Sequence, residues 1–214
     1  MTQGNISPEV EVMKIKEWMV KNPITVTKDH TLQECADLMK EHSIRHLPVV
    51  ENERLSGLVT ESGLRQAFIA SMFEDLDLED VMIKDPITAS QDVEIEDAAK
   101  IIFRNKIGGL PVVDSDDRVV GILTVVDLVA AFIEIMGLLQ SSSRLDVILG
   151  EEPEAFENVS QLIRSHGGEI ISVGISGHRL RRKRIYFFRL KKGKVEHIAE
   201  ALRDAGFEVV SSVA

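Results

Sequence analysis

Two short segments of the sequence carry residue types that could hold a small polar ligand. Thr124-Val125-Val126-Asp127 places a hydroxyl three residues before a carboxylate, whereas Thr60-Glu61-Ser62-Gly63 keeps the threonine but ends in glycine. A carboxylate can accept hydrogen bonds from both hydroxyls of a ribose, and a threonine at the start of a helix suits phosphate oxygens. We therefore expect the second segment to anchor a ligand that the first segment holds less well.

The other reactive side chains form no recognisable catalytic group. Cys35 falls on the apolar face of a predicted helix without a neighbouring base, which favours a core residue over a nucleophile. The spacing of His30, His42, His166, His178 and His197 is not typical of a metal site. The sequence contains no P-loop, dinucleotide fingerprint or serine-nucleophile motif. It therefore predicts no catalytic residue, no metal and no catalytic cofactor.

An internal repeat supplies the elements that must position the two segments. Residues 18–50 match residues 81–113 at a spacing of 63, and after one extra residue 54–64 match 118–128. Each copy predicts the order β-α-β-β-α from its β-branched and amphipathic stretches. One three-stranded sheet leaves an apolar face uncovered, so the two copies should pack about a pseudo-twofold axis and form two clefts.

The first helix of the first copy has a clear predicted start. Thr31 and Glu34 have the spacing of a capping box, in which each side chain accepts a hydrogen bond from the backbone of the other residue. Apolar side chains follow at helical spacing, including Leu32, Cys35 and Met39. This face is predicted to lie on the sheet.

The repeated motifs resemble the CBS domain pair, also called a Bateman module, over residues 12–136. They are M-x-x-x-P-I-T near each start, L-P-V-V in the middle and G-hydrophobic-hydrophobic-T before the last helix, with Asp127 completing the second copy. The resemblance implies that an adenosine base lies against the first strand and the L-P-V-V strand, with phosphate and ribose held by the closing motif. The implied second-repeat site consists of Thr88, Gly109, Leu110, Pro111, Thr124 and Asp127.

The two clefts are expected to be unequal. Gly108 and Gly109 should let a flat base approach the backbone of the second repeat closely. The first cleft lacks the ribose anchor because Gly63 replaces the aspartate, so weak binding or none is expected there. The residues that remain in this first-repeat cleft are Thr25, Arg45, His46, Leu47, Pro48 and Thr60. Arg45 and His46 either contact a phosphate of the ligand or are ordinary surface and salt-bridge groups.

The last seventy residues predict a second domain with the order β-α-β-β-α-β and glycines at both helix ends. This ferredoxin-like order resembles the ACT domain, whose members commonly bind amino acids at an interface between copies. Glu154 stands where that family typically has glycine, so a dimer or partner contact is favoured over amino-acid binding. The basic segment 177–184 is expected to be a solvated hairpin loop, with contact to an acidic partner, nucleic acid or the acidic repeats as the alternative.

Composition limits where the protein acts. The net charge is −10, the acidic excess lies in the repeats, and an acidic surface is a poor match for DNA or RNA. The sequence has one cysteine, and its N-terminal segment lacks the apolar core of a secretory signal. It also has no apolar run of the about 20 residues that span a bilayer. We therefore expect a cytoplasmic protein without a membrane anchor.

These observations predict an α+β protein with a tail at 1–11, CBS repeats at 12–70 and 71–137, a linker at 138–143 and an ACT-like domain at 144–214. We expect a non-catalytic sensor that binds AMP, ADP, ATP or a related adenosine ligand, mainly in the second cleft. It would signal to an unidentified protein partner, and its domain order is similar to that of bacterial acetoin-utilisation proteins. The alternatives are a dimerisation module with empty clefts and an ACT-type amino-acid sensor. A homodimer is expected, because both domain types leave apolar surface for isologous pairing.

Overall fold

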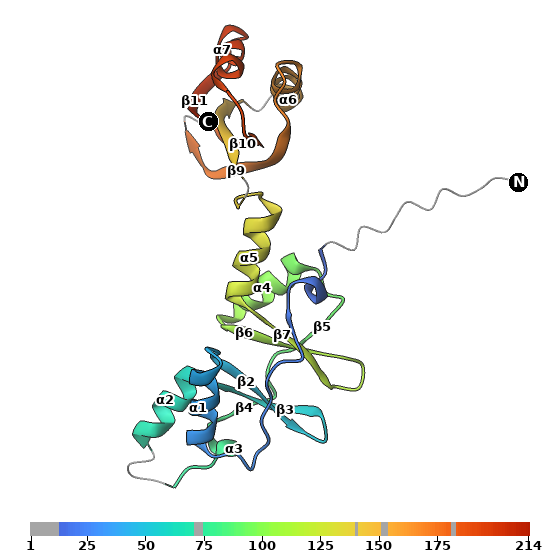
Figure 1. The fold of residues 1–214 in the computed structure, drawn as a ribbon, viewed down its shortest axis with the longest axis vertical. Helices are drawn as coiled ribbons and strands as arrows, with labels where there is room; N and C mark the ends of the chain where they lie inside the picture. The colour runs from blue at the N-terminus through green and yellow to red at the C-terminus, as the bar shows by residue number, and fades with distance from the viewer. Residues whose placement is uncertain (1–12, 71–74, 140, 151–153, 181–182) are drawn as a thin grey trace, which may run out of the picture. The chain divides into compact units, whose positions relative to one another are not determined.

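The chain divides into two compact units, Met1–Val129 and Ala130–Ala214. The computed structural model describes residues 13–70, 75–139, 141–150, 154–180 and 183–214 (Figure 1). The first unit holds the sequence repeats, and the second holds a four-stranded sheet with two helices.

The second repeat contains the predicted β-α-β-β-α elements, and each repeat begins with one further short strand. In the first repeat the predicted first strand at residues 24–27 is reduced to an isolated bridge between Val26 and Val49. The elements of the first repeat are η2 (Ile15–Glu17), β1 (Val20–Lys21), α1 (Leu32–Glu41), β2 (His46–Glu51), β3 (Arg54–Thr60) and α2 (Glu61–Ala70). The elements of the second repeat are α3 (Leu78–Val81), β4 (Ile83–Lys84), β5 (Ala89–Ser90), α4 (Ile95–Asn105), β6 (Gly109–Val113), β7 (Val119–Thr124) and α5 (Val125–Ile135).

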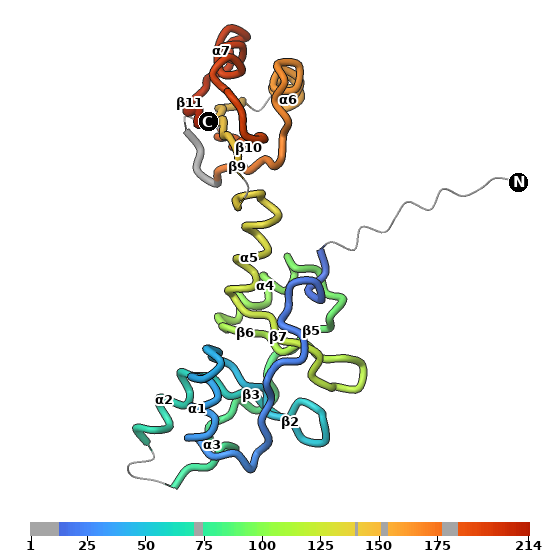
Figure 2. The backbone as a smooth tube through the Cα atoms, viewed as in Figure 1, coloured from blue at the N-terminus to red at the C-terminus, as the bar shows by residue number. Residues whose placement is uncertain are grey.

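The leading strands β1 and β4 are exchanged between the repeats. β1 pairs antiparallel with β7, where Val20 lies opposite Ile122, and β4 pairs antiparallel with β3, where Ile83 lies opposite Leu58. In Figure 2 the blue segment that precedes α1 runs past β7 of the second repeat. The resulting sheets have the orders β2-β3-β4 and β1-β7-β6-β5. The expectation of one self-contained three-stranded sheet per repeat is therefore wrong, because each sheet takes an edge strand from the other repeat.

A methionine next to each exchanged strand packs on a glycine of the other repeat. A Cβ atom placed on Gly57 would lie 2.6 Å from Sδ of Met82, and one placed on Gly121 would lie closer still to Sδ of Met19. Both methionines are buried. Side chains larger than hydrogen do not fit at these two strand positions without displacing the methionine.

The start of α1 and the burial of Cys35 confirm two expectations. The backbone N–H of Glu34 donates to Oγ1 of Thr31 at 3.2 Å, and the N–H of Thr31 donates to the Glu34 carboxylate at 2.8 Å, which completes the capping box. Cys35 lies in the core of the first repeat with Leu32 and Met39. Burial, with a smaller effect of the Glu34 charge, raises the pKa of the Cys35 thiol to about 11. The thiol is therefore protonated and unreactive at neutral pH.

The second unit has the order β-α-β-β-α-β that the sequence predicts. Its elements are β8 (Ser142–Leu149), α6 (Ala155–Ser165), β9 (Ile170–Leu180), β10 (Lys183–Lys191), α7 (Glu196–Asp204) and β11 (Glu208–Val213). The sheet order is β11-β8-β10-β9, and all neighbours are antiparallel. Side chains of both helices and of the sheet share one core around Phe188. Gly167 and Gly206 follow the helices with φ of 81° and 89°, as expected for helix C-termini.

The basic segment 177–184 differs from the prediction of a loop. β9 extends to Leu180 and β10 begins at Lys183, so Lys183 pairs with Leu180 and Arg184 pairs with Arg179. Only residues 181–182 separate the strands, and they lie outside the described residues, as do residues 151–153 before α6. The basic residues therefore mostly extend a two-stranded ribbon.

Candidate functional site

The sheet of the second repeat brings the predicted ligand-binding residues near one end. Thr88 directly precedes β5, Gly109 begins β6 and Thr124 ends β7. β5 runs parallel to β6, and Gly109 lies opposite Thr124 in the antiparallel pairing of β6 with β7. Gly109 and Thr124 therefore share one sheet end, Thr88 lies beside β6 at the level of Pro111, and Asp127 follows Thr124 in the first turn of α5.

Burial changes gradually across this group. Gly109, Leu110 and Pro111 are buried, Thr124 and Asp127 are half-buried, and Thr88 is exposed. An apolar strand edge beside accessible hydroxyl and carboxylate groups suits a ligand that has a flat apolar part and a polar part.

Asp127 has a structural role that the sequence interpretation missed. The backbone N–H of Thr124 donates to Oδ2 of Asp127 at 2.7 Å, and the Thr124 hydroxyl donates to the same oxygen at 2.6 Å. Asp127 thereby caps the start of α5, just as Glu34 caps α1. The sequence could have predicted this cap, because Thr124 and Asp127 have the same spacing as Thr31 and Glu34 in the capping box of α1. Among the described residues these hydrogen bonds use Oδ2 alone, which leaves Oδ1 for a ligand.

The corresponding end of the first sheet has the hydroxyl without the carboxylate. Thr60 ends β3 opposite His46, and its Oγ1 accepts a hydrogen bond from the backbone N–H of Gly63 at 3.1 Å. Gly63 lies within α2, and a Cβ atom there would be 3.2 Å from Oγ1 of Thr60. Glycine is therefore not required by the backbone conformation at this position.

The imidazole of His46 covers Gly108 and Gly109. A Cβ atom on Gly108 would lie 3.0 Å from Nε2 of His46, and one on Gly109 would lie 3.0 Å from Cγ of the same ring. This corrects the expectation that these two glycines leave room for a base, because the flat group packed on them is a side chain of the first repeat. Sequence reasoning missed the contact, although the repeat spacing makes His46 and Gly109 equivalent residues that can meet at a pseudo-twofold axis.

Burial decides the charge of His46. Removal of the ring from water, together with the positive charge of Arg45, lowers the pKa of the imidazole below its ordinary value. The ring is therefore neutral at pH 7 and is not a phosphate-binding cation there. The sequence interpretation had left that role open.

A second pair of equivalent residues meets at the hairpins between the strands. Arg54 and Arg118 form an antiparallel bridge, and the N–H of Leu55 donates to the carbonyl of Asp117 at 2.9 Å. Arg54 with Arg118 is the second contact between equivalent positions, after His46 with Gly109. Such contacts are expected where two repeats are related by a pseudo-twofold axis.

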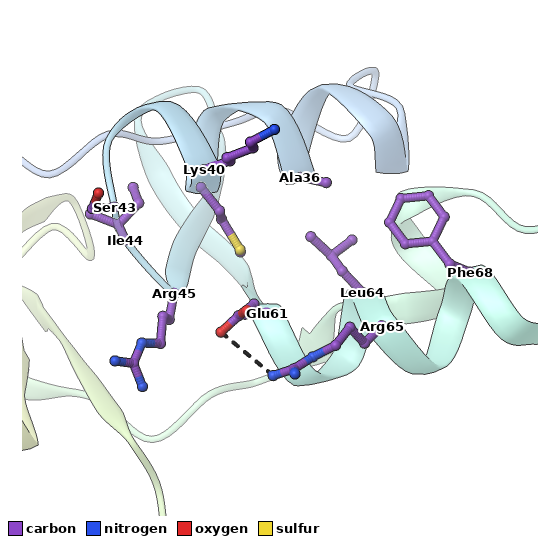
Figure 3. Close-up of a pocket in the computed structure, with 10 residues that line it drawn as sticks. Ala36, Lys40, Ser43, Ile44, Arg45, Glu61, Leu64, Arg65 and Phe68 are labelled. Atoms are coloured by element: carbon purple, nitrogen blue, oxygen red, sulfur yellow. Dashed lines mark ion pairs between the residues drawn. The ribbon is translucent and has the colours of Figure 1, made fainter.

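The remaining first-repeat residues lie on β2 or beside it, and the backbone N–H of Val26 donates to the carbonyl of Pro48 at 3.0 Å. Thr25 precedes Val26, which pairs with Val49 of β2, and Leu47 and Pro48 are buried in β2. Arg45 lines a groove of about 460 Å³ between α1 and α2 with Glu61, Arg65 and other residues (Figure 3). Within the described part of the chain no group of three or more His, Cys, Asp or Glu residues could hold a metal ion, and no helix is long and apolar enough to cross a membrane.

Comparisons with known proteins concentrate on the two repeats. A family model described as CBS domain matches residues 15–70 and 78–134, more than half of the chain. Inosine-5'-monophosphate dehydrogenase of Methanocaldococcus jannaschii is 32% identical over 171 residues, which cover 79% of this chain and 34% of that enzyme. The chain thus spans about a third of the length of this relative and less than half of the next two.

Two solved structures resemble the repeats at the level of the backbone. The CBS domain pair of protein MJ0100, in complex with 5'-methylthioadenosine and S-adenosyl-L-methionine, has a TM-score of 0.53 and 32% identity over 56% of this chain and 98% of that chain. A structure described as an acetoin utilization protein (AcuB) from Vibrio cholerae has a TM-score of 0.55 and 33% identity over 59% of this chain and 96% of that chain.

Proposed function

The chain belongs to the CBS domain family, and on that premise we propose that it is a non-catalytic regulatory protein that binds an adenosine-containing ligand in its second repeat. The observation that carries the proposal is the placement of Gly109, Thr124 and Asp127 at one sheet end, with Thr88 on the neighbouring strand beside Pro111. The adenosine ligands named for the MJ0100 pair support the ligand class.

Each part of the ligand would meet a different group. The adenine ring lies beside the buried strand from Gly109 to Pro111, the ribose hydroxyls donate to Oδ1 of Asp127, and phosphate or another polar substituent faces Thr124 and Thr88. Oδ2 keeps its cap on α5, so ribose binding does not open the helix. Because His46 covers Gly109, the base takes a position beside the imidazole rather than on the glycine backbone.

Binding at this sheet end would regulate through the exchanged strands. β1 of the first repeat is hydrogen-bonded to β7, whose last residue is Thr124, so a ligand that orders Thr124 also stabilises the contact between repeats. A ligand that binds one arrangement better than another shifts the population toward it. The likeness of the repeats to the AcuB structure supports a protein partner in acetoin or acetate metabolism. An ACT-like role for the second unit rests on its β-α-β-β-α-β order alone.

Calorimetry of the full chain with AMP, ADP, ATP and S-adenosylmethionine tests the ligand class, with GMP and GTP as controls. We expect at least one adenosine ligand to bind with one site per chain, and guanine nucleotides to bind at least about tenfold more weakly. At about 100 times its dissociation constant, that ligand should add about 2.7 kcal/mol to the free energy of unfolding. If no adenosine ligand binds, the pair is a structural module with empty clefts. A parallel titration with the twenty amino acids tests the ACT-type alternative, which is correct if an amino acid binds and no adenosine ligand does.

A further inference from the structure

The second unit has a groove of about 840 Å³ between helix α6 and strand β9. Phe156, Ile170 and Val173 give the groove an apolar part, and Glu157 and Arg164 are exposed along it. All of these residues belong to the second unit, so the groove is distinct from the proposed adenosine site in the second repeat.

β9 is an edge strand, because among the described strands it pairs only with β10. An edge strand presents unpaired backbone N–H and C=O groups along its free side. The pairing with β10 is in regular register from Ser172 to Ile175 and shifts on either side of this stretch. Proline and lysine, which often protect an edge strand from further pairing, are absent from the sequence of β9. β9 therefore offers a short backbone ladder next to the groove.

The other face of β9 is held in place by the segment that precedes the sheet. The hydroxyl of Ser172 donates to the backbone carbonyl of Met136 at 2.8 Å. A Cβ atom on Gly174 would lie 3.4 Å from Cε of Met136, and one on Gly137 would lie 2.6 Å from Cγ2 of Ile171. These contacts fix the strand before anything binds, so less conformational entropy is lost when a partner adds to its edge.

Ser160 is a buried polar residue that lines the groove. It is only 8% exposed, and its Oγ has no hydrogen-bond partner among the described residues. A hydroxyl that is buried without a partner is unfavourable, and such groups are rare in folded proteins. An occupant of the groove can supply the missing partner after a rotation about the Cα–Cβ bond of Ser160.

Two exposed charges flank Ser160 on the same face of α6. Glu157 lies three residues before it and Arg164 four residues after it, so the three side chains follow one helix face over about 10 Å. Neither charge has an ion pair within the described part of the chain. Phe156 stacks on Phe188 with the ring centroids 5.9 Å apart, which holds an aromatic group that is 43% exposed at the same end as Glu157.

We propose that this groove binds an extended segment of a partner protein, which adds an antiparallel strand to β9 beside α6. α6 ends close to the start of β9, so a segment antiparallel to β9 runs from Glu157 toward Arg164. Every second side chain of the segment faces α6, and three such side chains span about 13 Å. They are a lysine or arginine at Glu157, a small or aliphatic residue beside Ser160, and a carboxylate at Arg164. The partner is recognised by the order basic-x-aliphatic-x-acidic from its N-terminus.

Charge favours such a segment over a second copy of this chain. The strand that a second copy could add is its own β9, and Ile170–Leu180 contains no aspartate or glutamate. Glu169, just before that strand, already forms an ion pair with Lys191. A second copy would therefore leave Arg164 without a carboxylate and add Arg179 as a further cation. Binding in the groove requires no nucleotide, so its failure is distinguishable from failure of the proposed adenosine site.

Fluorescein-labelled pentapeptides test the proposal with the full chain. The probes begin with Lys and end with Glu, with aliphatic residues or threonine between, and a control set exchanges the two ends. We expect saturable binding of at least one Lys-first peptide in fluorescence polarisation, and at least about fivefold weaker binding of its exchanged counterpart. The proposal is overturned if no peptide binds saturably or if the exchanged order binds as well. Loss of the peptide as the chain concentration rises also overturns it, because a second copy then occupies β9.

Backbone methylation of the best peptide tests strand addition separately from charge. An N-methyl group removes a ladder donor only where the peptide N–H points at β9, which is at every second residue. Affinity should fall by at least about tenfold at those residues and stay within about threefold at the residues between them. An equal loss at all positions, or no loss at any, would show that the peptide does not add a strand.

Variants of α6 test the side-chain contacts. Arg164→Glu should improve the binding of Lys-ended peptides relative to Glu-ended peptides by at least about tenfold. Arg203→Glu is the matched control, because Arg203 is an exposed basic residue in the last turn of α7, as Arg164 is in α6. The same change of preference in Arg203→Glu would contradict the assignment of Arg164.

Ser160→Ala separates a binding role from a structural one. The substitution removes a hydroxyl that has no partner, so the urea midpoint should not fall. Affinity for the best peptide should fall by about threefold to tenfold. Unchanged affinity, or a lower urea midpoint, would show that the Ser160 hydroxyl serves the fold and not the partner.

Discussion

The two repeats share the contacts that build the fold and differ at the position proposed to hold a ligand and along their helical faces, where Phe103 corresponds to Lys40. Met19 on Gly121 and Met82 on Gly57 form the same contact twice. Asp127 has no carboxylate counterpart, because Gly63 occupies the equivalent position. The exchange of edge strands makes each repeat depend on the other, so the packing residues must match. The cleft and the helical face are local, so each repeat can differ there without loss of the common fold.

The largest expected effect is on ligand affinity at Asp127. Asp127→Ala removes charge-assisted hydrogen bonds worth about 1.5–3 kcal/mol, which corresponds to roughly a tenfold to hundredfold weaker binding in calorimetry. Asp127→Glu is the matched control for the cap, because Thr31 and Glu34 show that glutamate caps a helix of this protein. Glutamate should keep the stability and still weaken binding, since its carboxylate is displaced by one methylene. Unchanged affinity in both variants would show that the ligand does not bind at Asp127.

The next effect concerns the contacts that the repeats have in common. Gly57→Ala and Gly121→Ala should each lower the free energy of unfolding by about 1–3 kcal/mol, because the added methyl group overlaps a buried methionine. Trp18, the only tryptophan, lies beside Met19, so its fluorescence during urea unfolding reports on the first unit. Gly121→Ala should lower the free energy of unfolding by less in a Met19→Ala variant, because the side chain that it displaces is then absent. A strongly unequal cost in the two repeats would contradict the symmetry of these contacts.

Gly63→Asp should reduce the difference between the clefts. The new carboxylate completes a Thr60-x-x-Asp capping box in α2, and replacement of a helical glycine adds a few tenths of a kcal/mol or more. If the missing aspartate alone weakens the first cleft, calorimetry should show a second site per chain. Gly63→Asn is the control, since it restores side-chain bulk without charge. A stoichiometry that stays at one would mean that His46 or other first-cleft residues also exclude the ligand.

The smallest effect is the pH dependence that His46 adds to stability. Its folded-state pKa is lowered, so below the unfolded value of about 6.5 the unfolded chain binds more protons. The free energy of unfolding should therefore decrease as pH falls through 6.5 toward the folded pKa, with no contribution from His46 above that range. Urea unfolding at pH 7.5 and 5.5 should show a smaller difference for His46→Gln than for wild type. An equal difference would show that the ring titrates normally.

Much of the fold was predictable from the sequence because it depends on short-range patterns. The capping box of α1 follows from two residues three apart, and the β-branched runs predicted every strand of the second repeat except the short leading strand β4. The β-α-β-β-α-β order of the second unit was read in the same way. The family motif also identified the group around Asp127 as the candidate ligand site, although that role remains a proposal.

The tertiary structure alone decided what occupies the space between the repeats. A spacing of 63 residues shows that His46 and Gly109 are equivalent, but only the folded chain shows that they touch and that the ring fills the place expected for a base. The exchange of β1 and β4 likewise depends on pairing between residues about a hundred apart for β1 and about twenty-five apart for β4. Periodicity determines which residues share a face of one helix or strand. It does not determine which of the two sheets an edge strand joins, because that choice depends on packing between elements that are distant in the sequence.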